Sequence, residues 1–494
     1  MIRTGSQYID SIRDGREVYL NGERVKDVTL HPMFKPLVDI RARIYDMQHE
    51  EATRQVMTYC QGGETFAVPN KPPVSQQDWR DKRAAVDAVL NEIGGVVTRV
   101  GDETIGEMWS LMDGQEMLKA ADPRFADNVQ RHIDRALYED PFHVSANTDP
   151  KGDRSKAPQD QDPDMLLHLV KETSAGVIVR GAKYETAAAY ANQAFTKPTI
   201  ANWGNAAYSD YALGFIADMG APNMKFICRT GFASRAPADD YPLANRFDEV
   251  DALIIFDDVL IPWENVFQYG DVDKSNMFMR RSGFGQRLTL QGATRLAVKL
   301  DFISGLLLKA LSLTGTSEFR GVQTRLGEVL SYRELIWSLT EAMIRHPEPW
   351  LGGSVQPEPQ ACDSYRWIST VIYPKVREII FQDLGSALIY LPSHVKDFDV
   401  PELRGYLDKY VRGSGGVEAE ERVKTLKMLW DAVGTEFGGR HELYERNYQG
   451  NHEQIRVSIF GAGEGRGWNK QLVAFAEQAM SEYDREGWTL PELQ

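Results

Sequence analysis

The 494-residue sequence is poor in the residues that build metal centres and disulfides. It has only three cysteines, Cys60, Cys228 and Cys362, which form no CxxC pair, and its nine histidines form no HxxxH or HExxH pattern. Protein-bound zinc and iron–sulfur clusters need closely spaced cysteine and histidine ligands, so we expect no metal site. Isolated cysteines are typical of a reducing compartment, which favours a cytoplasmic protein.

The chain also lacks long apolar runs and an excess of positive charge. No segment approaches the ~20 apolar residues of a membrane-spanning helix, and residues 1–8 contain no signal-peptide core. The formal net charge of −15 at pH 7 disfavours nucleic acid as a partner. We therefore expect neither a membrane nor a nucleic acid to be bound.

What the sequence does contain is three stretches with different apolar spacing. Residues 1–140 have mainly helical spacing, apart from a hairpin around Asn21-Gly22. Residues 141–272 are rich in strand-like segments, and residues 273–494 return to long helices. The pattern predicts an α+β protein with an N-terminal helical domain, a middle β-domain and a C-terminal four-helix bundle. Bundles of this kind often associate through apolar faces, so a homo-oligomer is expected.

Individual elements are predicted inside these stretches. The expected strands are 166–170, 176–180, 252–256 and a strand from 259 that ends at Pro262. The expected helices are 79–96, 103–138, 294–313, 322–344, 365–390 and 418–434, with a Pro- and Gly-rich loop at 346–359.

A polar loop, Asp149-Pro-Lys-Gly-Asp-Arg-Ser155, marks the boundary between the helical first part and the strand-rich middle. Arg supplies a planar fork of donors, Ser a hydroxyl, and Gly allows close backbone approach. These groups suit a phosphate-bearing or ring-shaped cofactor. An Asp-Arg pair in a loop is also typical of an exposed ion pair.

Several blocks of the sequence resemble the 4-hydroxyphenylacetate 3-hydroxylase family, the oxygenase component of two-component aromatic hydroxylases. They include the loop motif Asp153-Arg-Ser155 and the C-terminal run Phe437-Gly-Gly-Arg-His-Glu-Leu-Tyr444. The blocks are 8–22, 25–28, 31–32, 153–155, 248–252, 261–267, 294–300, 319–329 and 437–448. They follow one another along nearly the whole chain. The C-terminal blocks are most similar to members of natural-product pathways, including hydroxylases of carrier-bound tyrosine derivatives.

The resemblance implies an acyl-CoA-dehydrogenase-like fold, usually assembled as a homotetramer. It also implies that reduced FAD (FADH2) comes from a separate NAD(P)H–flavin reductase and reacts with O2. The resulting C4a-hydroperoxide transfers an oxygen atom to an electron-rich ring. The chain has no GxGxxG nicotinamide fingerprint at a strand–helix junction, which agrees with a separate reductase. The protein would exclude water and orient the ring.

Carrying the flavin contacts of the family over to this sequence gives four segments, among which Arg154 is expected to anchor the flavin. The candidate cofactor-binding residues are Ser145, Ala146, Asn147, Lys151, Gly152, Asp153, Arg154, Thr186, Gln449, Gly450 and Asn451.

The candidate catalytic residues depart from the family pattern. Arg99 is retained and is expected to bind a substrate carboxylate or oxygen, but Glu103 stands where the family has Tyr. Ser145 and Gln291 occupy the positions of two family histidines, and neither can accept a phenol proton at neutral pH. His143 either replaces the missing base or is a hydrogen-bonded loop histidine. Glu103 is a base, a ligand for a cationic or N–H-bearing group, or an exposed carboxylate at a helix start.

The leading hypothesis is an FADH2-dependent monooxygenase acting on an aromatic or N-heteroaromatic ring, such as a pyrrole, indole or hydroxypyridine. Hydroxylation of a phenol or of a carrier-bound tyrosine derivative is the alternative. A catalytically altered flavin-binding homologue is a third possibility. A related branch, the iron–sulfur CoA-ester dehydratases, is disfavoured because the three cysteines do not supply its close ligand pair.

Overall fold

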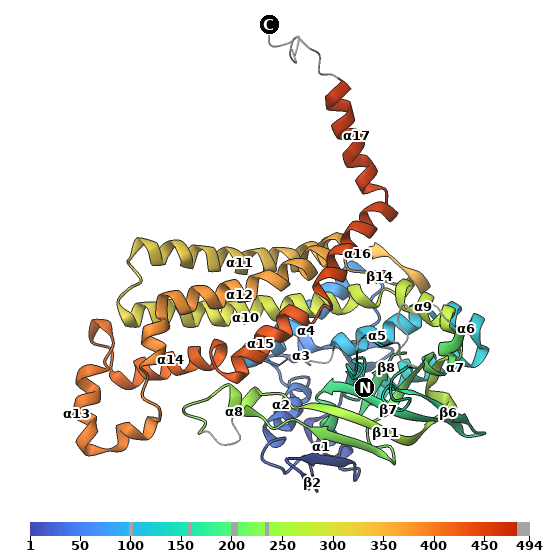
Figure 1. Cartoon of the computed structure of the whole chain (residues 1–494), viewed down its shortest axis with the longest axis horizontal. Helices are drawn as coiled ribbons and strands as arrows, with labels where there is room; N and C mark the ends of the chain where they lie inside the picture. The colour runs from blue at the N-terminus through green and yellow to red at the C-terminus, as the bar shows by residue number, and fades with distance from the viewer. Residues whose placement is uncertain (98–101, 154, 157–159, 199–205, 233–236, 482–494) are drawn as a thin grey trace.

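A computed structural model describes residues 1–97, 102–153, 155–156, 160–198, 206–232 and 237–481 of the chain (Figure 1). Helices of the C-terminal part form one layer, and two β-sheets with the N-terminal helices form the other. A final helix leaves the body and projects away from both layers.

The N-terminal part is helical, as its apolar spacing predicts. Its helices and two short hairpins are α1 (Gly5–Ser11), β1 (Glu17–Leu20), β2 (Glu23–Val25), α2 (Lys35–Asp46), α3 (Arg54–Met57), β3 (Thr58–Gln61), β4 (Glu64–Ala67), α4 (Gln76–Ile93), α5 (Asp102–Asp113), α6 (Gln115–Ala121) and α7 (Pro123–Glu139). The predicted hairpin joins β1 to β2, and Asn21 and Gly22 have φ of 55° and 82°. Positive φ at both central residues is what a tight two-residue hairpin turn requires.

Two sheets form the middle of the molecule. The larger sheet has the strand order β2-β1-β10-β11-β7-β6, so the N-terminal hairpin extends a sheet built mostly from the middle segment. The smaller sheet has the order β12-β9-β8-β5. The strands are β5 (His143–Ser145), β6 (His168–Glu172), β7 (Gly176–Thr186), β8 (Gln193–Thr196), β9 (Leu213–Asp218), β10 (Met224–Cys228), β11 (Asp251–Pro262) and β12 (Val266–Tyr269).

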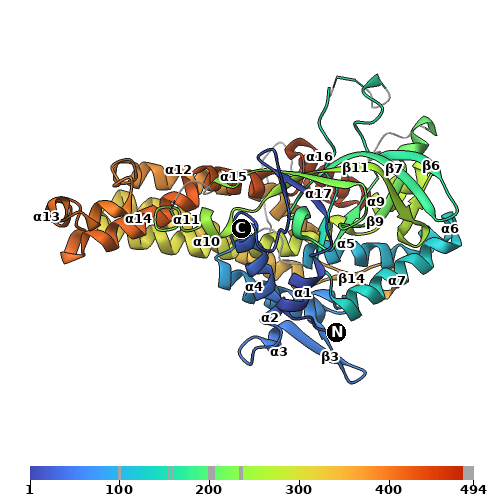
Figure 2. The ribbon, with the colours of Figure 1, turned by 90° about the horizontal axis from the view of Figure 1, so that it is seen from below.

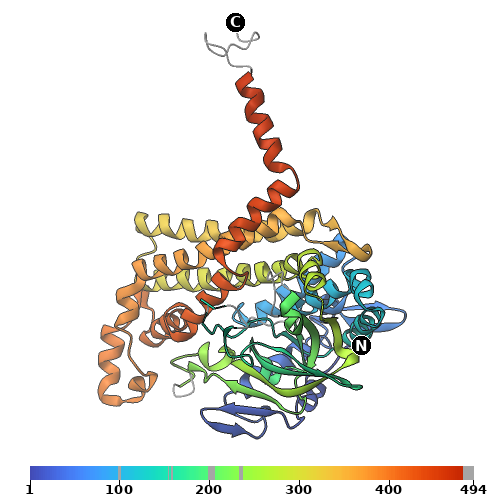
Figure 3. The ribbon, with the colours of Figure 1, turned by 45° about the vertical axis from the view of Figure 1, so that its right-hand side comes forward.

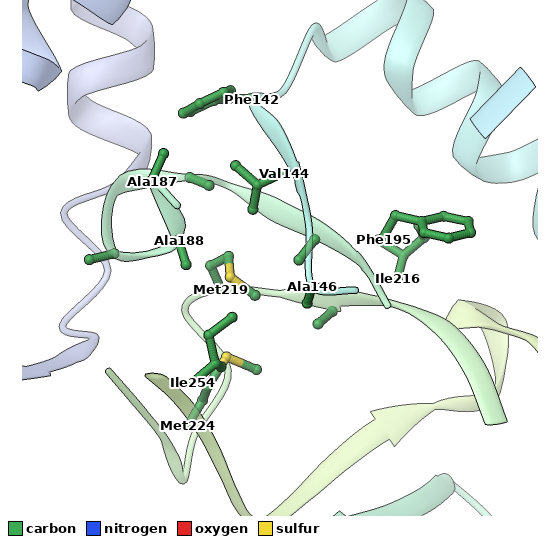
Figure 4. Packing of buried hydrophobic residues seen from close by; sticks show 14 of the residues in the cluster. Phe142, Val144, Ala146, Ala187, Ala188, Phe195, Ile216, Met219, Met224 and Ile254 are labelled. Carbon is green, nitrogen blue, oxygen red and sulfur yellow. The ribbon is translucent and has the colours of Figure 1, made fainter. Parts of the chain in front are cut away.

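A hydrophobic core fills the space between these sheets. Figure 4 shows Val144 of β5 and Ala146, which directly follows β5, in one cluster with Phe195, Ile216 and Ile254 of β8, β9 and β11. Burial of large apolar side chains from both sheets is the main force that holds them together.

The helical layer contains three long helices, α10 (Phe284–Thr314), α11 (Arg320–Arg345) and α12 (Pro359–Ile389), which lie side by side in Figures 1 and 3. The shorter helices of this part are α8 (Ala244–Phe247), α9 (Val272–Arg281), α13 (Pro401–Tyr410), α14 (Ala419–Val433), α15 (Glu436–Asn447), α16 (His452–Gly465) and α17 (Trp468–Ser481). Helix α4 packs on α10, as Figure 2 shows, and on α11, so the N-terminal part also contributes to the core of this layer.

Most predicted elements are confirmed, and several bounds are wrong. The strands expected at 252–256 and from 259 are the single strand β11, because a β-bulge between Phe256 and Val259 lets its pairing with β7 continue. Helix α12 begins at Pro359 rather than at Tyr365. The run 103–138 is three helices, because Gly114 precedes α6 and Pro123 opens α7. Helix α10 begins at Phe284 rather than Thr294, and its predicted stop at Gly315 is confirmed. The loop 346–359 contains a short hairpin of β13 (Glu348–Pro349) and β14 (Val355–Gln356).

Candidate active site

Strand β5 carries two of the candidate residues on one face. Side chains alternate along a strand, so His143 and Ser145 point away from the hydrophobic core that receives Val144 and Ala146 (Figure 4). The backbone N–H of Ala146 donates to the carbonyl oxygen of Phe195, 2.8 Å away. Ala146 therefore offers a ligand little beyond its carbonyl, and strand β5 as a whole packs against α5.

His143 is buried, and two arginines act electrostatically on its imidazole. Burial is the main cause that lowers the pKa of His143 to about 3, and His132, Arg135 and Arg41 act in the same direction. An imidazole with so low a pKa stays neutral and is a weak proton acceptor at neutral pH. The assignment of His143 as a replacement base remains a prediction, and its surroundings favour a structural role.

The loop that follows β5 is anchored at its start and open at its tip. The Asp149 carboxylate forms an ion pair of 2.6 Å with Lys183, which is fully buried on β7. Lys151, Gly152 and Asp153 are exposed. Asp153 accepts hydrogen bonds from the backbone N–H and the hydroxyl of Ser155. Asp153 therefore uses part of its acceptor capacity within the loop itself.

Thr186 ends β7 and takes part in a polar junction between the sheet and α15. Its hydroxyl donates to the Asp251 carboxylate at 2.6 Å. Asp251 also pairs with Arg440, which in turn pairs with Asp248. Because the Thr186 hydroxyl donates to a carboxylate here, only its lone pairs remain to contact a cofactor.

Helix α10 presents a row of buried polar side chains at every fourth position. Arg287, Gln291, Arg295 and Lys299 are each no more than 1% exposed. Residues four apart lie above one another on a helix, so the four side chains form one stripe. Such a stripe on a buried helix needs partners from other elements, because unpaired buried charges are costly.

Three members of this stripe have protein partners. Arg287 pairs with Asp113 at the end of α5. Arg295 and Lys299 both pair with the Glu445 carboxylate of α15, with Arg295 Nε 3.2 Å from Glu445 Oε1. These ion pairs join α10 to α5 on one side and to α15 on the other.

Gln291 is different. It is 1% exposed, and among the residues that the structure describes neither polar atom of its amide has a hydrogen-bond partner. The Nε2 atom of Gln449 is likewise without a partner among them. The Thr289 hydroxyl lies 3.2 Å from Gln449 Oε1, which places Gln449 beside the segment of α10 that carries Gln291. A buried amide without partners costs about 1–3 kcal/mol, so these groups fit a bound polar ligand.

The structure therefore brings together part of the predicted site. Helix α5, which has Glu103 in its first turn, packs against both α10 and β5, so the elements that carry Glu103, Ser145 and Gln291 meet. Arg99 and Arg154 lie outside the described residues. Gly450 and Asn451 continue the Gln449 turn, where the Asn451 side chain accepts from the backbone N–H groups of Glu453 and Gln454 in the first turn of α16.

Four charged residues of this region are not among the candidates predicted from the sequence: Arg287, Arg295, Lys299 and Glu445. The signal was present, because polar residues at positions 287, 291, 295 and 299 interrupt an otherwise apolar helix at regular four-residue spacing.

The residues present fit a flavin better than a metal. The isoalloxazine edge bears both donors and acceptors, which match the buried amides of Gln291 and Gln449. Within the described part of the chain, no group of three or more His, Cys, Asp or Glu side chains is placed to hold a metal ion. None of the described helices is long and apolar enough to cross a membrane.

Comparison with models of protein families shows to which family the chain belongs. The N-terminal model of 4-hydroxyphenylacetate 3-hydroxylase matches residues 4–268, and the C-terminal model of the same family matches residues 275–477. The chain belongs to this family. Its fold is the predicted α+β, acyl-CoA-dehydrogenase-like fold. As a family member, the chain is an oxygenase component of the flavin-dependent monooxygenases, with FAD as cofactor and O2 as oxidant.

Individual relatives cover the whole chain. An oxygenase component of 4-nitrophenol 2-monooxygenase from Rhodococcus sp is 45% identical over 99% of this chain and 94% of its own length. A (3S)-3-amino-3-(3-chloro-4-hydroxyphenyl)propanoyl peptidyl-carrier protein monooxygenase from Streptomyces globisporus is 43% identical over 99% of this chain and 93% of its own length. The solved structure of a 4-hydroxyphenylacetate 3-monooxygenase oxygenase component, complexed with FAD and 4-hydroxyphenylacetate, is 28% identical with a TM-score of 0.90. That match covers 97% of this chain and 99% of the solved one.

Proposed function

We propose that this oxygenase hydroxylates a small aromatic or N-heteroaromatic molecule whose ring is already electron-rich. A separate NAD(P)H–flavin reductase would supply the FADH2. The observation that supports this choice of substrate is the buried amide of Gln291, whose donor group and acceptor have no partner among the residues that the structure describes. An amide of this kind can read the polar edge of a ring but cannot remove a proton from it.

The cofactor would be held from two sides. Gln449, Gly450 and Asn451 would contact it from the helical layer, and the segment from Ser145 to Asn147 from the sheets. The loop residues Lys151, Gly152, Asp153 and Arg154 would hold its polar part. When bound, reduced flavin supplies the chemistry, capturing O2 and passing one oxygen atom to the ring. The chain's own residues exclude water and orient the substrate, with Arg99 binding a carboxylate or oxygen.

The absence of a strong base defines the substrate class. Ser145 and Gln291 accept no proton at neutral pH, and burial makes His143 a weak acceptor. Glu103 is the remaining candidate, either as a base or as a partner for an N–H group. A ring that needs no deprotonation by the protein, such as a pyrrole, indole or hydroxypyridine, therefore suits the site best.

A second candidate function is supported by the names of the relatives. The 45% and 43% identical proteins are named for phenolic substrates, one free and one carrier-bound. A nitrophenol ionises near neutral pH without help, because the nitro group withdraws electrons from the phenolate. A phenol of this acidic kind fits the same site as an N-heteroaromatic ring, whereas 4-hydroxyphenylacetate needs a base that the candidate residues do not obviously supply.

A substrate panel distinguishes these two candidate functions. The protein is assayed with FAD, NADH and a generic flavin reductase, and hydroxylated product is compared with hydrogen peroxide released by uncoupled turnover. We expect coupled hydroxylation of N-heteroaromatic rings or of 4-nitrophenol, and turnover of 4-hydroxyphenylacetate lower by about 10²–10⁴-fold, the usual value of general-base help. Efficient hydroxylation of 4-hydroxyphenylacetate contradicts the proposal. Peroxide without product from every ring favours the catalytically altered homologue.

The two-component scheme has its own test. In anaerobic titrations we expect the protein to bind reduced FAD more tightly than oxidised FAD and to leave NADH unoxidised unless a reductase is added. Equal affinity for both redox states, or NADH oxidation by the protein alone, contradicts the need for a partner reductase. We further propose that the chain works as a homotetramer in the reducing environment of the cytoplasm, where its exposed Cys60 would stay a free thiol.

A further inference from the structure

Helix α10 contacts the Gln449 side chain at two neighbouring positions. The Thr289 hydroxyl lies 3.2 Å from Gln449 Oε1, and it also donates to the carbonyl oxygen of Gly285 at 2.6 Å. Gly292 lies about one turn further along the helix, and a Cβ atom built on it would be 3.0 Å from Gln449 Nε2. Thr289 is 0% exposed and Gln449 is 8% exposed, so this contact is made away from solvent.

The Thr289 hydroxyl has one proton for two acceptors. A hydroxyl donates one hydrogen bond and accepts through its lone pairs. The Gly285 carbonyl oxygen is the nearer acceptor, and donation to the carbonyl four residues earlier is a common bond of a threonine inside a helix. Once the proton is given to Gly285, the Thr289 oxygen faces Gln449 as an acceptor. It then suits an amide NH2 group at that place and not an amide oxygen.

A half-turn of the Gln449 amide supplies that NH2 group. With Oε1 on the side of Thr289, Nε2 has no partner among the described residues. After a half-turn about the last side-chain bond, Nε2 donates to the Thr289 hydroxyl and the oxygen lies beside Gly292. The Cα hydrogens of a glycine suit an amide oxygen better than an NH2 group. Buried N–H groups without partners are also rarer in proteins than such carbonyl groups, which favours this orientation.

We propose that Thr289 is a positioning residue that turns the oxygen of the Gln449 amide toward the cofactor. Gln449 then accepts a hydrogen bond from an N–H group of the isoalloxazine ring instead of donating to one of its carbonyl oxygens. The role of Thr289 rests on the proposed contact between Gln449 and the flavin. The backbone of the turn is held separately, because the guanidinium carbon of Arg295 lies 4.4 Å from the centre of the Tyr448 ring. Thr289 therefore determines only which end of the amide faces the ligand.

The test compares threonine variants at two positions of α10. Thr289→Val replaces the hydroxyl with a methyl group of similar size, and Thr289→Ser keeps the hydroxyl. Thr294→Val is the matched control, because Thr294 is also 0% exposed and its hydroxyl donates to the carbonyl oxygen of Leu290 at 2.8 Å. Thr294 lies about 140° around the helix from Thr289. Both valine variants lose one bond within the helix, so their free energies of unfolding should change alike.

Anaerobic titration with FADH2 gives the first readout. Without the Thr289 hydroxyl the Gln449 amide samples several orientations, and the apparent affinity falls with the fraction that stays correctly oriented. We expect about five- to tenfold weaker binding for Thr289→Val, and less than about a twofold change for Thr289→Ser and Thr294→Val. Added to Gln449→Leu, Thr289→Val should have no further effect, because it acts through that amide.

A crystal structure of the wild-type protein with reduced FAD bound gives the second readout and needs no substitution. Ring nitrogen N3 or N5, each of which bears a hydrogen in reduced flavin, should lie beside the Gln449 amide. Any other cofactor atom there, such as a ring carbonyl oxygen, overturns the proposal.

The affinities can also overturn it. Equal weakening by Thr294→Val, no rescue by Thr289→Ser, or additive effects of Thr289→Val and Gln449→Leu would each do so. Weaker binding in Gln449→Leu with unchanged binding in Thr289→Val overturns the role of Thr289 alone. An unchanged affinity in Gln449→Leu contradicts the proposed flavin contact itself, and the role of Thr289 with it.

Discussion

Replacing Gln291 with leucine should make the unliganded protein more stable and the enzyme worse. The amide is 1% exposed and has no hydrogen-bond partner among the described residues. Leucine has a similar size and no polar atoms, so it removes two unsatisfied groups without leaving a large cavity. The stability gain and the loss of function would then come from the same two atoms.

The expected magnitudes follow from the energetics of buried amides. An unsatisfied buried polar group costs about 1–3 kcal/mol, and we expect the free energy of unfolding to rise within that range. The lost hydrogen bonds to a ligand should cost about 1–3 kcal/mol of binding, or roughly five- to 150-fold in affinity. Gln291→Leu should weaken the binding of substrate, whereas Gln449→Leu should weaken the binding of FADH2.

Denaturant unfolding of the ligand-free protein and anaerobic titrations of both ligands measure these effects. Gln323→Leu on the exposed side of α11 is the matched control, because it makes the same chemical change where the amide is solvated. It should alter neither stability nor affinity by more than about 0.5 kcal/mol. A lower free energy of unfolding for Gln291→Leu would mean that the Gln291 amide has hydrogen-bond partners in the ligand-free protein, which contradicts the prediction. If it leaves the affinities for substrate and flavin unchanged, Gln291 does not contact a ligand.

Three further predictions concern charged groups. Arg154→Ala should weaken FADH2 binding by roughly 1.5–3 kcal/mol without changing the melting curve, and an unchanged affinity places Arg154 outside the cofactor site. Glu445→Gln should lower the free energy of unfolding by about 3–5 kcal/mol, because it leaves the buried cations Arg295 and Lys299 unpaired. Lys299→Met should cost less, because it leaves Arg295 and Glu445 as a balanced pair. Denaturant unfolding that gives the reverse order contradicts this account of the stripe. Burial lowers the pKa of His143 to about 3, whereas a histidine in the unfolded chain titrates at ~6.5. The unfolded chain therefore binds the extra proton between these two values, and the folded protein loses stability as the pH falls from about 6.5 toward 3. His143→Gln should show a shallower loss of stability over this range in acid unfolding.

Local signals in the sequence were sufficient for most of the fold. The Asn21-Gly22 hairpin, the strand that ends at Pro262 and the helix that ends at Gly315 are each set by the backbone preference of one or two residues. The same local logic fails where several helices share one apolar pattern. The run 103–138 keeps helical spacing across two breaks, and only Gly114 and Pro123 mark them.

The candidate site was harder to predict because its members meet only in the folded chain. Gln291 and Gln449 are 158 positions apart, and nothing local to either reveals that Thr289 brings them together. The charge partners of Arg287, Arg295 and Lys299 come from α5 and α15, so their pairing also depends on tertiary structure. Family resemblance supplied the positions of Gln291 and Gln449, and burial supplied the reason why they matter.

The polar stripe on α10 has a consequence for how substrate range can change. Arg287, Arg295 and Lys299 each hold two elements together, so a substitution at any of them disturbs the scaffold. Gln291 lies in the same stripe, but its amide joins no two elements among the described residues. A single exchange there can alter which ring is accepted while the ion pairs on either side keep the helix in place. The helix thus separates a variable position from its fixed neighbours, and directed evolution for new substrates should find its tolerated changes at position 291 first.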